Sequence, residues 1–565
     1  MLLLVSACAN TAAGEDGAIT DVGGRSRDAG ASSDGSVADS AAAPGFPQPN
    51  PRAPRLMAPL SHTRATNRRP TLRWALPSGS TGARIEICRD RACMHLDETL
   101  NVTGDHARPT AELSPGPHFW RAVALEGDTA RTELSWTWMF HVGVVSTPSD
   151  YAAGVIADLN GDGYGELLAR VESDQGRADW NAPLLVIPGS ESGLQTEASW
   201  RQPIEAAYPI GDVNGDGLLD LVRTRMLGEG YEGISPEVQI VHGSEVSSSS
   251  NSQTIQLPGD HLDHFWEPVG DTNHDGYADL FIRSYVLPFW QIPGTLRIDD
   301  RSTFMAVYLG QRDGLTDSQR ILRPDTFPMG GESNLHATFV LDKGDMTGDG
   351  ISDWVVRLGY IQSERVFIYP GSGVGWPVST PIELRVPEGQ SIYVTDGTPC
   401  DFNGDGLADI AAVGVSVAFL SQSLLIYFGS REIGIPYEPG YVSHPFTNPR
   451  AQSYQGAFCA EMNGDRYSDF LIQEGARSLV WYPGGPNGLG SSRVLWEAPE
   501  GFTIAYGVAI GDVDGNGIAD IVIGSASEIL TFSATSGGVP AITSRVPFEA
   551  LGIHLQEREH VFLFM

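Results

Sequence analysis

The chain has 565 residues and 41% of them are hydrophobic, so it is long enough for several domains or one large repeat array. Glycine (66 residues) and proline (37 residues) are both frequent, which favours many turns and few long helices. The apolar runs are short and end at Gly, Pro, Asn or Asp, and this pattern predicts an all-β protein. The formal net charge of −34 disfavours nucleic acids and anionic lipid headgroups as partners.

The first eight residues, MLLLVSAC, are too few for a transmembrane helix or a complete signal peptide. The segment Val5-Ser6-Ala7-Cys8 resembles a bacterial lipobox, which implies cleavage before Cys8 and a lipid on its thiol. A positively charged n-region is missing, so we expect the true translation start to lie upstream; the alternative is a stray cysteine near an apolar start. The resemblance implies an exported, lipid-anchored protein of the outer membrane or cell surface.

Residues 9–55 are rich in Ala, Gly, Ser and Asp and contain almost no large apolar side chain. A segment of this composition does not bury enough apolar surface to fold. We therefore predict a disordered tether that holds the folded part of the chain away from the membrane.

Four cysteines remain besides Cys8, and an even number suits the same oxidising compartment. Cys88 and Cys93 are close enough in sequence for a disulfide that staples a local turn. Cys400 and Cys459 occupy nearly equivalent places in neighbouring repeats, so they form either a disulfide between repeats or two free buried thiols. The chain has no CxxC pair, which disfavours a thiolate zinc site.

Residues 56–143 form a separate unit of short alternating strands, such as 83–88 and 118–123, with turn signals between them. A unit of this length and pattern fits a small β-sandwich. Its segments PTLRW and GPHFWRA resemble fibronectin type III-like domains of bacterial surface proteins. We interpret its tryptophans as core residues and not as a platform for carbohydrate.

A nonapeptide recurs seven times in the rest of the chain, at intervals of 51 to 74 residues. The copies are DLNGDGYGE from Asp158, DVNGDGLLD from Asp212, DTNHDGYAD from Asp271, DMTGDGISD from Asp345, DFNGDGLAD from Asp401, EMNGDRYSD from Glu461 and DVDGNGIAD from Asp512. An apolar run precedes and follows each copy, and a second β-run then ends in a glycine turn. About four short strands per repeat is the content of one propeller blade, so residues 145–565 are predicted to form a seven-bladed β-propeller behind the sandwich.

The oxygen-bearing residues of the nonapeptide suit calcium, which takes six to eight hard oxygen ligands. Positions 1, 3, 5 and 9 supply side-chain oxygens, position 7 supplies a backbone carbonyl and leaves its side chain free, and Gly at position 6 allows the positive φ that the loop needs. The alternative is that Asp, Asn and Gly are merely good turn formers. The predicted metal ligands are Asp158, Asn160, Asp162, Tyr164, Glu166, Asp212, Asn214, Asp216, Leu218, Asp220, Asp271, Asn273, Asp275, Tyr277, Asp279, Asp345, Thr347, Asp349, Ile351, Asp353, Asp401, Asn403, Asp405, Leu407, Asp409, Glu461, Asn463, Asp465, Tyr467, Asp469, Asp512, Asp514, Asn516, Ile518 and Asp520.

The first half of the nonapeptide is similar to an EF-hand loop, but the last acidic ligand comes at position 9 and no helices flank it. The repeats resemble the FG-GAP (VCBS-like) repeats of integrin α-subunit propellers, over about three quarters of the chain. This resemblance implies up to seven bound Ca²⁺ ions. The copies are unequal, since Thr347 is a weak ligand, Glu166 is one carbon longer than Asp, and Glu461 and Arg466 depart from the motif. We expect the sixth site to be the weakest.

No metalloprotease, nucleophile-elbow, phosphate-loop or thiol-protease motif is present, and we predict that the chain is not an enzyme. The pair His261 and His264 is interpreted as solvated loop residues. The favoured function is adhesion or ligand capture at the cell surface, with an unknown protein or glycan bound near the variable segments 283–306 and 313–338. The alternatives are a polysaccharide lyase or hydrolase built on the propeller, and a spacer without a ligand.

Overall fold

A computed structural model describes residues 50–148 without a break and most of residues 158–564. The gaps in the second part are at 174–183, 199, 203–205, 228–234, 244–251, 256–262, 274, 286–302, 323–338, 343, 359–364, 373–380, 389, 395–398, 417–421, 432–438, 443–456, 475–476, 500–507, 526 and 554–558. Every regular element within these bounds is a β-strand, so the all-β prediction is confirmed for the described residues. No described helix could cross a lipid bilayer.

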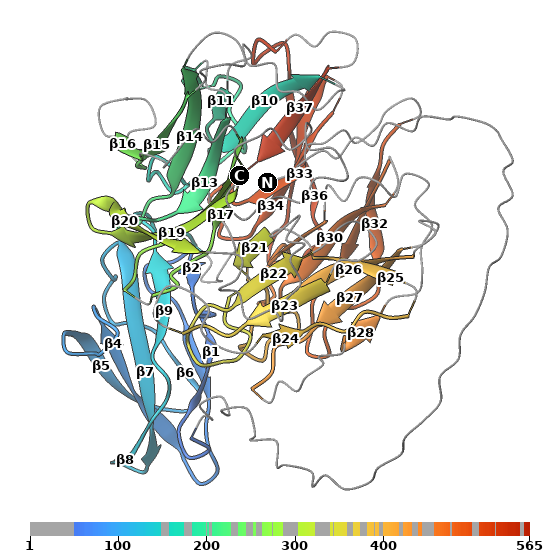
Figure 1. Cartoon of the computed structure of the whole chain (residues 1–565). Coiled ribbons are helices and arrows are strands. Elements are labelled where there is room, and N and C mark those ends of the chain that lie inside the picture. Colours follow the sequence, from blue (N-terminus) through green and yellow to red (C-terminus); the bar gives the residue numbers. More distant parts are fainter. Residues whose placement is uncertain are drawn as a thin grey trace, which may run out of the picture.

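The N-terminal unit contains two sheets, drawn in blue and cyan in Figure 1. The smaller sheet has the order β1-β3-β6, with bounds Arg55–Ala58, Leu72–Ala75 and His106–Ala107. The larger has the order β2-β9-β7-β4-β5, with β8 also paired to β7; its bounds are Thr63–Ala65, Trp138–Val142, Gly116–Glu126, Gly82–Cys88, Leu96–Thr103 and, for β8, Thr129–Leu134.

The tryptophans of the N-terminal unit fill its core. Trp74, Trp120 and Trp138 are buried, and the rings of Trp120 and Trp138 meet edge to face with centroids 6.4 Å apart. Trp136 is only half-buried and packs at the border of this core. Three of the four tryptophans therefore lie where the sequence interpretation put them, and Trp136 keeps part of its ring accessible.

Seven four-stranded antiparallel sheets follow, and we number them in chain order (Figure 1). Sheet 1 has the order β12-β11-β10-β37, with bounds Trp200–Gln202, Leu184–Ile187, Leu167–Ser173 and Glu559–Phe564. Sheet 2 comprises β13 (Ala206–Gly211), β14 (Asp220–Leu227), β15 (Ser235–Val241) and β16 (Ser252–Ile255). Sheet 3 comprises β17 (Asp263–Pro268), β18 (Leu280–Tyr285), β19 (Thr303–Gln311) and β20 (Gly314–Leu322).

The other four sheets repeat this plan. Sheet 4 comprises β21 (Phe339–Asp342), β22 (Trp354–Leu358), β23 (Arg365–Tyr369) and β24 (Ile382–Glu383). Sheet 5 comprises β25 (Gln390–Val394), β26 (Ile410–Ser416), β27 (Gln422–Tyr427) and β28 (Tyr441–Val442). Sheet 6 comprises β29 (Ala457–Ala460), β30 (Asp469–Glu474), β31 (Ser478–Tyr482) and β32 (Arg493–Glu497), and sheet 7 comprises β33 (Val508–Gly511), β34 (Asp520–Gly524), β35 (Glu528–Ser533) and β36 (Ala541–Pro547).

The second and third strands of these sheets are apolar on both faces because each sheet is covered on both sides. Sheets 2 and 3 share one buried cluster that includes Val222 and Leu280, and sheets 4 and 5 share another that includes Ile368 and Ile410. One such cluster joins every neighbouring pair of sheets, including sheet 7 with sheet 1. The sheets therefore follow one another in a closed circle, which is consistent with a propeller-like fold.

The C-terminal strand closes the circle. The strand-like sequence of residues 560–564 suggests pairing near residues 140–157, but the described part of that segment does not pair with it, since β9 belongs to the N-terminal unit. β37 pairs with β10 instead, from Leu168 opposite Phe564 to Ser173 opposite Glu559. β37 occupies the place that the strand before the nonapeptide holds in the other six sheets, and it covers an edge of β10 that would otherwise lack backbone partners.

Both cysteine pairs are joined as disulfides. Cys88 and Cys93 close a turn after β4, with their Cα atoms 5.1 Å apart. Cys400 and Cys459 join sheet 5 to sheet 6, with their Cα atoms 6.3 Å apart, within the buried cluster that the two sheets share. The alternative of two free thiols does not apply to this pair.

Candidate metal centre in a ring of acidic loops

The seven nonapeptides, which we call loops 1–7, have one hydrogen-bonding plan, and loop 2 illustrates it. The carboxylate at position 1, Asp212, accepts the N–H of Gly215 at 2.6 Å and the N–H of Gly217 at 2.8 Å. The two glycines have φ of 74° and 90°, a region that side chains with a Cβ rarely adopt. Position 1 thus holds the loop in its turn conformation before any metal is considered.

Position 9 has a structural role that the sequence analysis missed. Oδ2 of Asp220 accepts the N–H of Val213 within the loop at 2.9 Å, and Oδ1 accepts the N–H of Gly243 at 2.8 Å. Gly243 lies in the turn after the third strand of the sheet. Loops 3, 4, 5 and 6 repeat both bonds, with Asp279, Asp353, Asp409 and Asp469 as acceptors. The glycine turn after each second β-run was the signal that could have revealed this pairing.

Neighbouring loops touch through positions 4 and 7. A Cβ added at Gly215 would lie 2.6 Å from the Tyr277 ring, and a Cβ added at Gly515 would lie 2.7 Å from the Tyr164 ring. Four further pairs follow the same rule, namely Gly161 with Leu218, Gly348 with Leu407, Gly404 with Tyr467 and Gly464 with Ile518. The prediction that the position 7 side chain is left free is therefore wrong, because it packs against the position 4 glycine of the preceding loop.

Backbone hydrogen bonds reinforce these contacts. The N–H at position 8 donates to the carbonyl at position 1 of the preceding loop, as from Ala278 to Asp212 at 2.9 Å and from Gly165 to Asp512 at 2.6 Å. The same bond links loops 5, 6 and 7 to loops 4, 5 and 6. Since loop 1 bonds to loop 7, the predicted ligands lie in one ring of mutually supporting loops.

Most carboxyl groups at positions 1 and 9 of the loops are buried, and burial penalises their charged form. Burial raises the pKa of Asp279 to about 7, of Asp469 to about 8 and of Glu166 to about 9. Burial, with Asp514 and Asp512 nearby, also raises the pKa of Asp520 well above its usual range. Without a cation these buried positions are therefore unfavourable for negative charge.

Loop 7 offers the best fit to a metal ion among the described residues. One carboxylate oxygen from each of Asp512, Asp514 and Asp520 lies within 4.8 Å of the others. Oδ1 of Asp520 is buried without a hydrogen-bond partner among the described residues, and the same holds for Oε2 of Glu461 in loop 6. Three hard oxygen donors around one point suit Ca²⁺, which also accepts carbonyl and amide oxygens such as those at positions 7 and 5. The residues present therefore fit the metal.

Loop 6 departs from the plan where the sequence does. Arg466 occupies position 6 with φ of 78°, whereas the other loops have glycine there. Its guanidinium is exposed and lies over the Tyr467 ring, 5.2 Å from the centroid, so it points away from the ligands. Glu461 still accepts the N–H of Gly464 at 2.5 Å. Arg466 therefore strains the backbone of loop 6, but it does not place a positive charge among the metal ligands.

The N-terminal unit lies against loops 2–5, a contact that the sequence did not indicate. Arg64 donates to the Gly217 carbonyl in loop 2 at 2.7 Å, and His62 Nε2 lies 3.0 Å from the Gly350 carbonyl in loop 4. Arg55 donates to the Asp405 carbonyl in loop 5. The position 6 glycine of loop 3, Gly276, faces Pro117 and Phe119. Carbonyl groups on the outside of the loops thus serve as the docking surface for the N-terminal unit.

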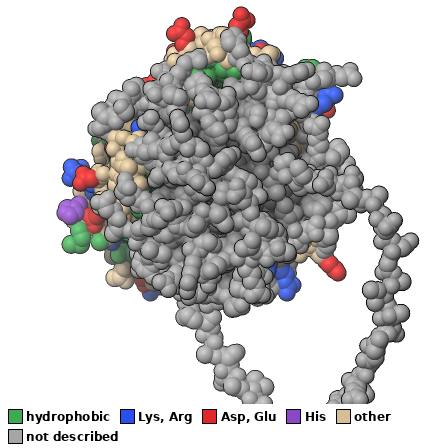
Figure 2. Space-filling view, turned by 45° about the horizontal axis from the view of Figure 1, so that its top comes forward, with side chains coloured by type: hydrophobic (Ala, Val, Ile, Leu, Met, Phe, Trp, Pro, Cys, Tyr) green, Lys and Arg blue, Asp and Glu red, His purple; other side chains and the backbone are tan. Residues whose placement is uncertain are grey.

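Several predicted features lie outside the described residues. They are Cys8, the tether up to residue 49, His261 and most of the variable segments 283–306 and 313–338; the side chain of His264 is likewise not described. In the view of Figure 2 the described side chains lie at the rim, where acidic, basic and hydrophobic groups are intermingled. In the loops, the position 9 carboxyl groups and all those at position 1 except Asp401 are buried, whereas Asp162, Asp216 and Asp275 at position 5 are exposed.

No protein-family model matches the chain. It is 29% identical over 195 residues to integrin alpha-PS5 of Drosophila melanogaster, a match that covers 33% of this chain and 18% of the integrin subunit. Among solved structures, a lectin of Agrocybe aegerita that recognises non-reducing terminal N-acetylglucosamine aligns with 71% of this chain and 96% of its own, at 14% identity and a TM-score of 0.41. A quinoprotein alcohol dehydrogenase-like protein of Bacteroides thetaiotaomicron aligns with 90% of this chain and 98% of its own, at 8% identity and a TM-score of 0.22. The chain thus has a distant similarity to part of an integrin α-subunit.

Proposed function

We propose that this chain is a calcium-binding surface protein that captures a protein or glycan ligand. In this proposal the seven sheets are the blades of an FG-GAP β-propeller, and the N-terminal unit is a fibronectin type III-like sandwich that stands before it. The distant similarity to an integrin α-subunit supports an adhesion or ligand-binding role. The chain is proposed to act by binding and not by catalysis, after export and attachment to the outer membrane or cell surface through Cys8.

The observation that carries the proposal is the convergence of buried carboxylates in a closed ring of loops. The loops hold 21 acidic side chains at positions 1, 3, 5 and 9, and burial penalises the charge of buried members such as Asp279, Asp469 and Asp520. Up to seven Ca²⁺ ions would change the formal net charge from −34 to −20 and would stiffen the loops against one another. A rigid ring is a suitable base for loops that recognise a ligand.

Metal analysis of the full chain tests the calcium part of the proposal. After dialysis against micromolar CaCl₂ and gel filtration, elemental mass spectrometry is expected to find several calcium ions per chain. Asp514→Asn removes one of the three converging carboxylates and is expected to remove one ion. Asp128→Asn, at an exposed turn of the N-terminal unit, is the matched control and is expected to remove none.

Ligand capture is tested separately on a glycan array, with the protein labelled and applied in calcium or in EDTA. Binding to a defined glycan class that is lost in EDTA supports the proposal. A protein that holds calcium and yet binds neither glycans nor cell-surface protein extracts in either buffer would instead be a spacer.

A further inference from the structure

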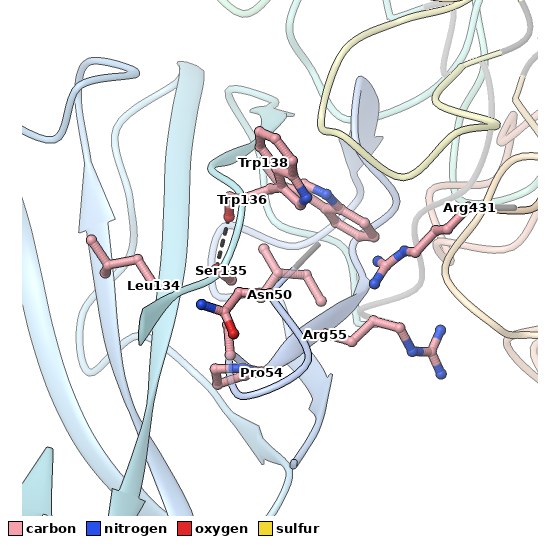
Figure 3. A pocket seen from close by; sticks show the side chains of 10 residues that line it. Asn50, Pro54, Arg55, Leu134, Ser135, Trp136, Trp138 and Arg431 are labelled. Atoms are coloured by element: carbon pink, nitrogen blue, oxygen red, sulfur yellow. Dashed lines mark hydrogen bonds between the residues drawn. The ribbon is translucent and has the colours of Figure 1, made fainter. Parts of the chain in front are cut away.

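A cleft of about 330 Å³ lies where the N-terminal unit meets sheet 5. Its walls include Arg55 and Trp136 from the N-terminal unit and Arg431 from the turn after β27, as Figure 3 shows. The volume lies at the lower end of the range for small-molecule sites and suits one or two sugar rings.

The charged side chains that line the cleft are two arginines, Arg55 and Arg431, with no Asp or Glu among the described lining residues. Asp345 and Asp405 of loops 4 and 5 lie close enough to act on Arg431 and offset part of its charge. Nε of Arg431 is buried without a hydrogen-bond partner among the described residues. Arg55 already donates to the Asp405 carbonyl, and its charge acts against that of Arg431. Two guanidinium groups at one cleft, one of them with an unused donor, favour an anionic ligand that accepts two hydrogen bonds, as a carboxylate does.

The cleft also has an aromatic wall. Trp136 is half-buried, and Trp138 is buried with its Cδ1 atom close to Gly350 of loop 4. In Figure 3 the indoles extend toward the Arg431 side chain. A tryptophan face beside a guanidinium suits a ligand that carries its carboxylate on a ring with an apolar face. A uronic acid has this combination, because the C–H groups of the pyranose can lie on the indole while the carboxylate faces the arginines.

We propose that this cleft binds a uronate residue of an acidic glycan, with Arg431 and Arg55 on the carboxylate and Trp136 on the sugar ring. The inference deepens the proposed ligand-binding function by naming the ligand class and the place where it binds. It does not require that the loops hold calcium.

Calorimetric titration of the full chain with trigalacturonate tests the proposal. Neutral galactotriose keeps the ring without the charge, and acetate keeps the charge without the ring. Both are expected to bind at least about tenfold more weakly than trigalacturonate, because each lacks one of the two interactions. Equal binding of galactotriose, or of an aspartate-rich peptide, would overturn the uronate assignment.

The variants Arg431→Gln and Trp136→Ala are each expected to weaken trigalacturonate binding by about tenfold or more, and Arg431→Lys by less because it keeps the charge. Arg493→Gln is the matched control, since Arg493 also lies over a tryptophan, Trp481, but outside the cleft. The Arg493→Gln variant is expected to bind trigalacturonate with the same affinity as the parent chain. Unchanged affinity in both Arg431→Gln and Trp136→Ala would place the ligand elsewhere and overturn the proposal.

The calcium content and melting temperature of each variant are measured on the same sample, so a folding defect is recognised directly. A chain that binds calcium but not trigalacturonate contradicts the cleft assignment alone. A chain that binds trigalacturonate through Arg431 without calcium contradicts the metal proposal and leaves the cleft assignment standing.

Discussion

Loops 4 and 7 share one motif but differ in what surrounds their carboxylates. In both loops burial is the largest cause that raises the carboxyl pKa values, and the loop's own carboxylates add to it. In loop 4 the positive charges of Arg431 and of Arg91, from the N-terminal unit, oppose this shift at Asp345 and Asp349. In loop 7 the neighbouring charges that raise the pKa of Asp512 and Asp520 come from the loop's own carboxylates.

The difference teaches that this protein has two ways to offset the charge of an acidic loop. In loop 4, guanidinium groups already supply part of the positive charge. Loop 7 has three converging carboxylates and a buried oxygen without a hydrogen-bond partner among the described residues, so under the calcium proposal a bound cation supplies the offset. We therefore expect loop 7 to bind calcium more tightly than loop 4, where Thr347 also replaces a stronger ligand.

Removal of calcium is expected to have the largest effect. Ions bound at a hundred times their dissociation constant stabilise a protein by about 2.7 kcal/mol per site, so two such sites shift the melting temperature of a chain of this size by about 5 °C. Thermal melting in CaCl₂ and in EDTA measures the shift. Asp514→Asn is expected to lower the calcium affinity of loop 7, the tightest phase of a calcium titration. Thr347→Asn is expected to raise the calcium affinity of loop 4, a later phase. Identical titrations of the two variants would contradict the contrast between the loops.

The pH dependence of the metal-free protein is expected to be the next largest effect. Glu166, Asp279 and Asp469 have raised pKa values of about 9, 7 and 8, so the folded chain binds their protons more tightly than the unfolded chain, in which such groups titrate near pH 4. Stability is therefore greatest at low pH and falls as the pH rises from about 4 to about 9. Calcium binding displaces these protons, so the calcium affinity rises over the same range.

Melting in EDTA at several pH values, with calcium titrations beside it, measures both trends. A metal-free protein whose melting temperature rises between pH 5 and pH 8 would show that these carboxyl groups are ionised in the fold, and the account of the ring would be wrong.

Arg91→Gln is expected to have an intermediate effect. It removes a positive charge that lies near Asp349. The free energy of unfolding of the metal-free protein is therefore expected to fall by about 1–2 kcal/mol, while loop 4 binds calcium more tightly. Arg89→Gln is the matched control on the same hairpin, because the Arg89 side chain is exposed and pairs with Asp97. The Arg89→Gln substitution is expected to change the free energy of unfolding by less than about 0.5 kcal/mol. Equal losses in the two variants would mean that Arg91 does not offset the charge of loop 4.

Arg466→Gly is expected to have the smallest effect. Glycine removes the strain of φ at 78° in loop 6, worth about 1 kcal/mol, but the contact of the guanidinium with Tyr467 is lost. Calcium binding at loop 6 is expected to tighten. Gly517→Arg places the same strain in loop 7 and is expected to weaken binding there. If neither variant changes the calcium titration, position 6 does not control occupancy.

Much of this architecture could be predicted from the seven nonapeptides, because their oxygen-bearing residues and flanking apolar runs recur together. Position 4 could not be interpreted, since the need for glycine at Gly215 arises from Tyr277 in the next repeat. The contact of the N-terminal unit with loops 2–5 could not be predicted either, because Arg64 and Arg91 belong to no sequence pattern that links them to the loops. The pairing of β37 with β10 depends on which sheet edge lacks a partner strand in the folded protein, and no local sequence pattern predicts this.

The pairing of β37 with β10 also has a consequence for how the chain folds during synthesis. The first sheet is completed by β37, which begins at Glu559 and so emerges from the ribosome long after β12, the last of its other strands, which ends at Gln202. Until then β10 presents a row of unused amide and carbonyl groups that any extended segment can join. A growing chain of this kind needs protection from neighbouring chains, by a chaperone or by slow release, until its last strand arrives.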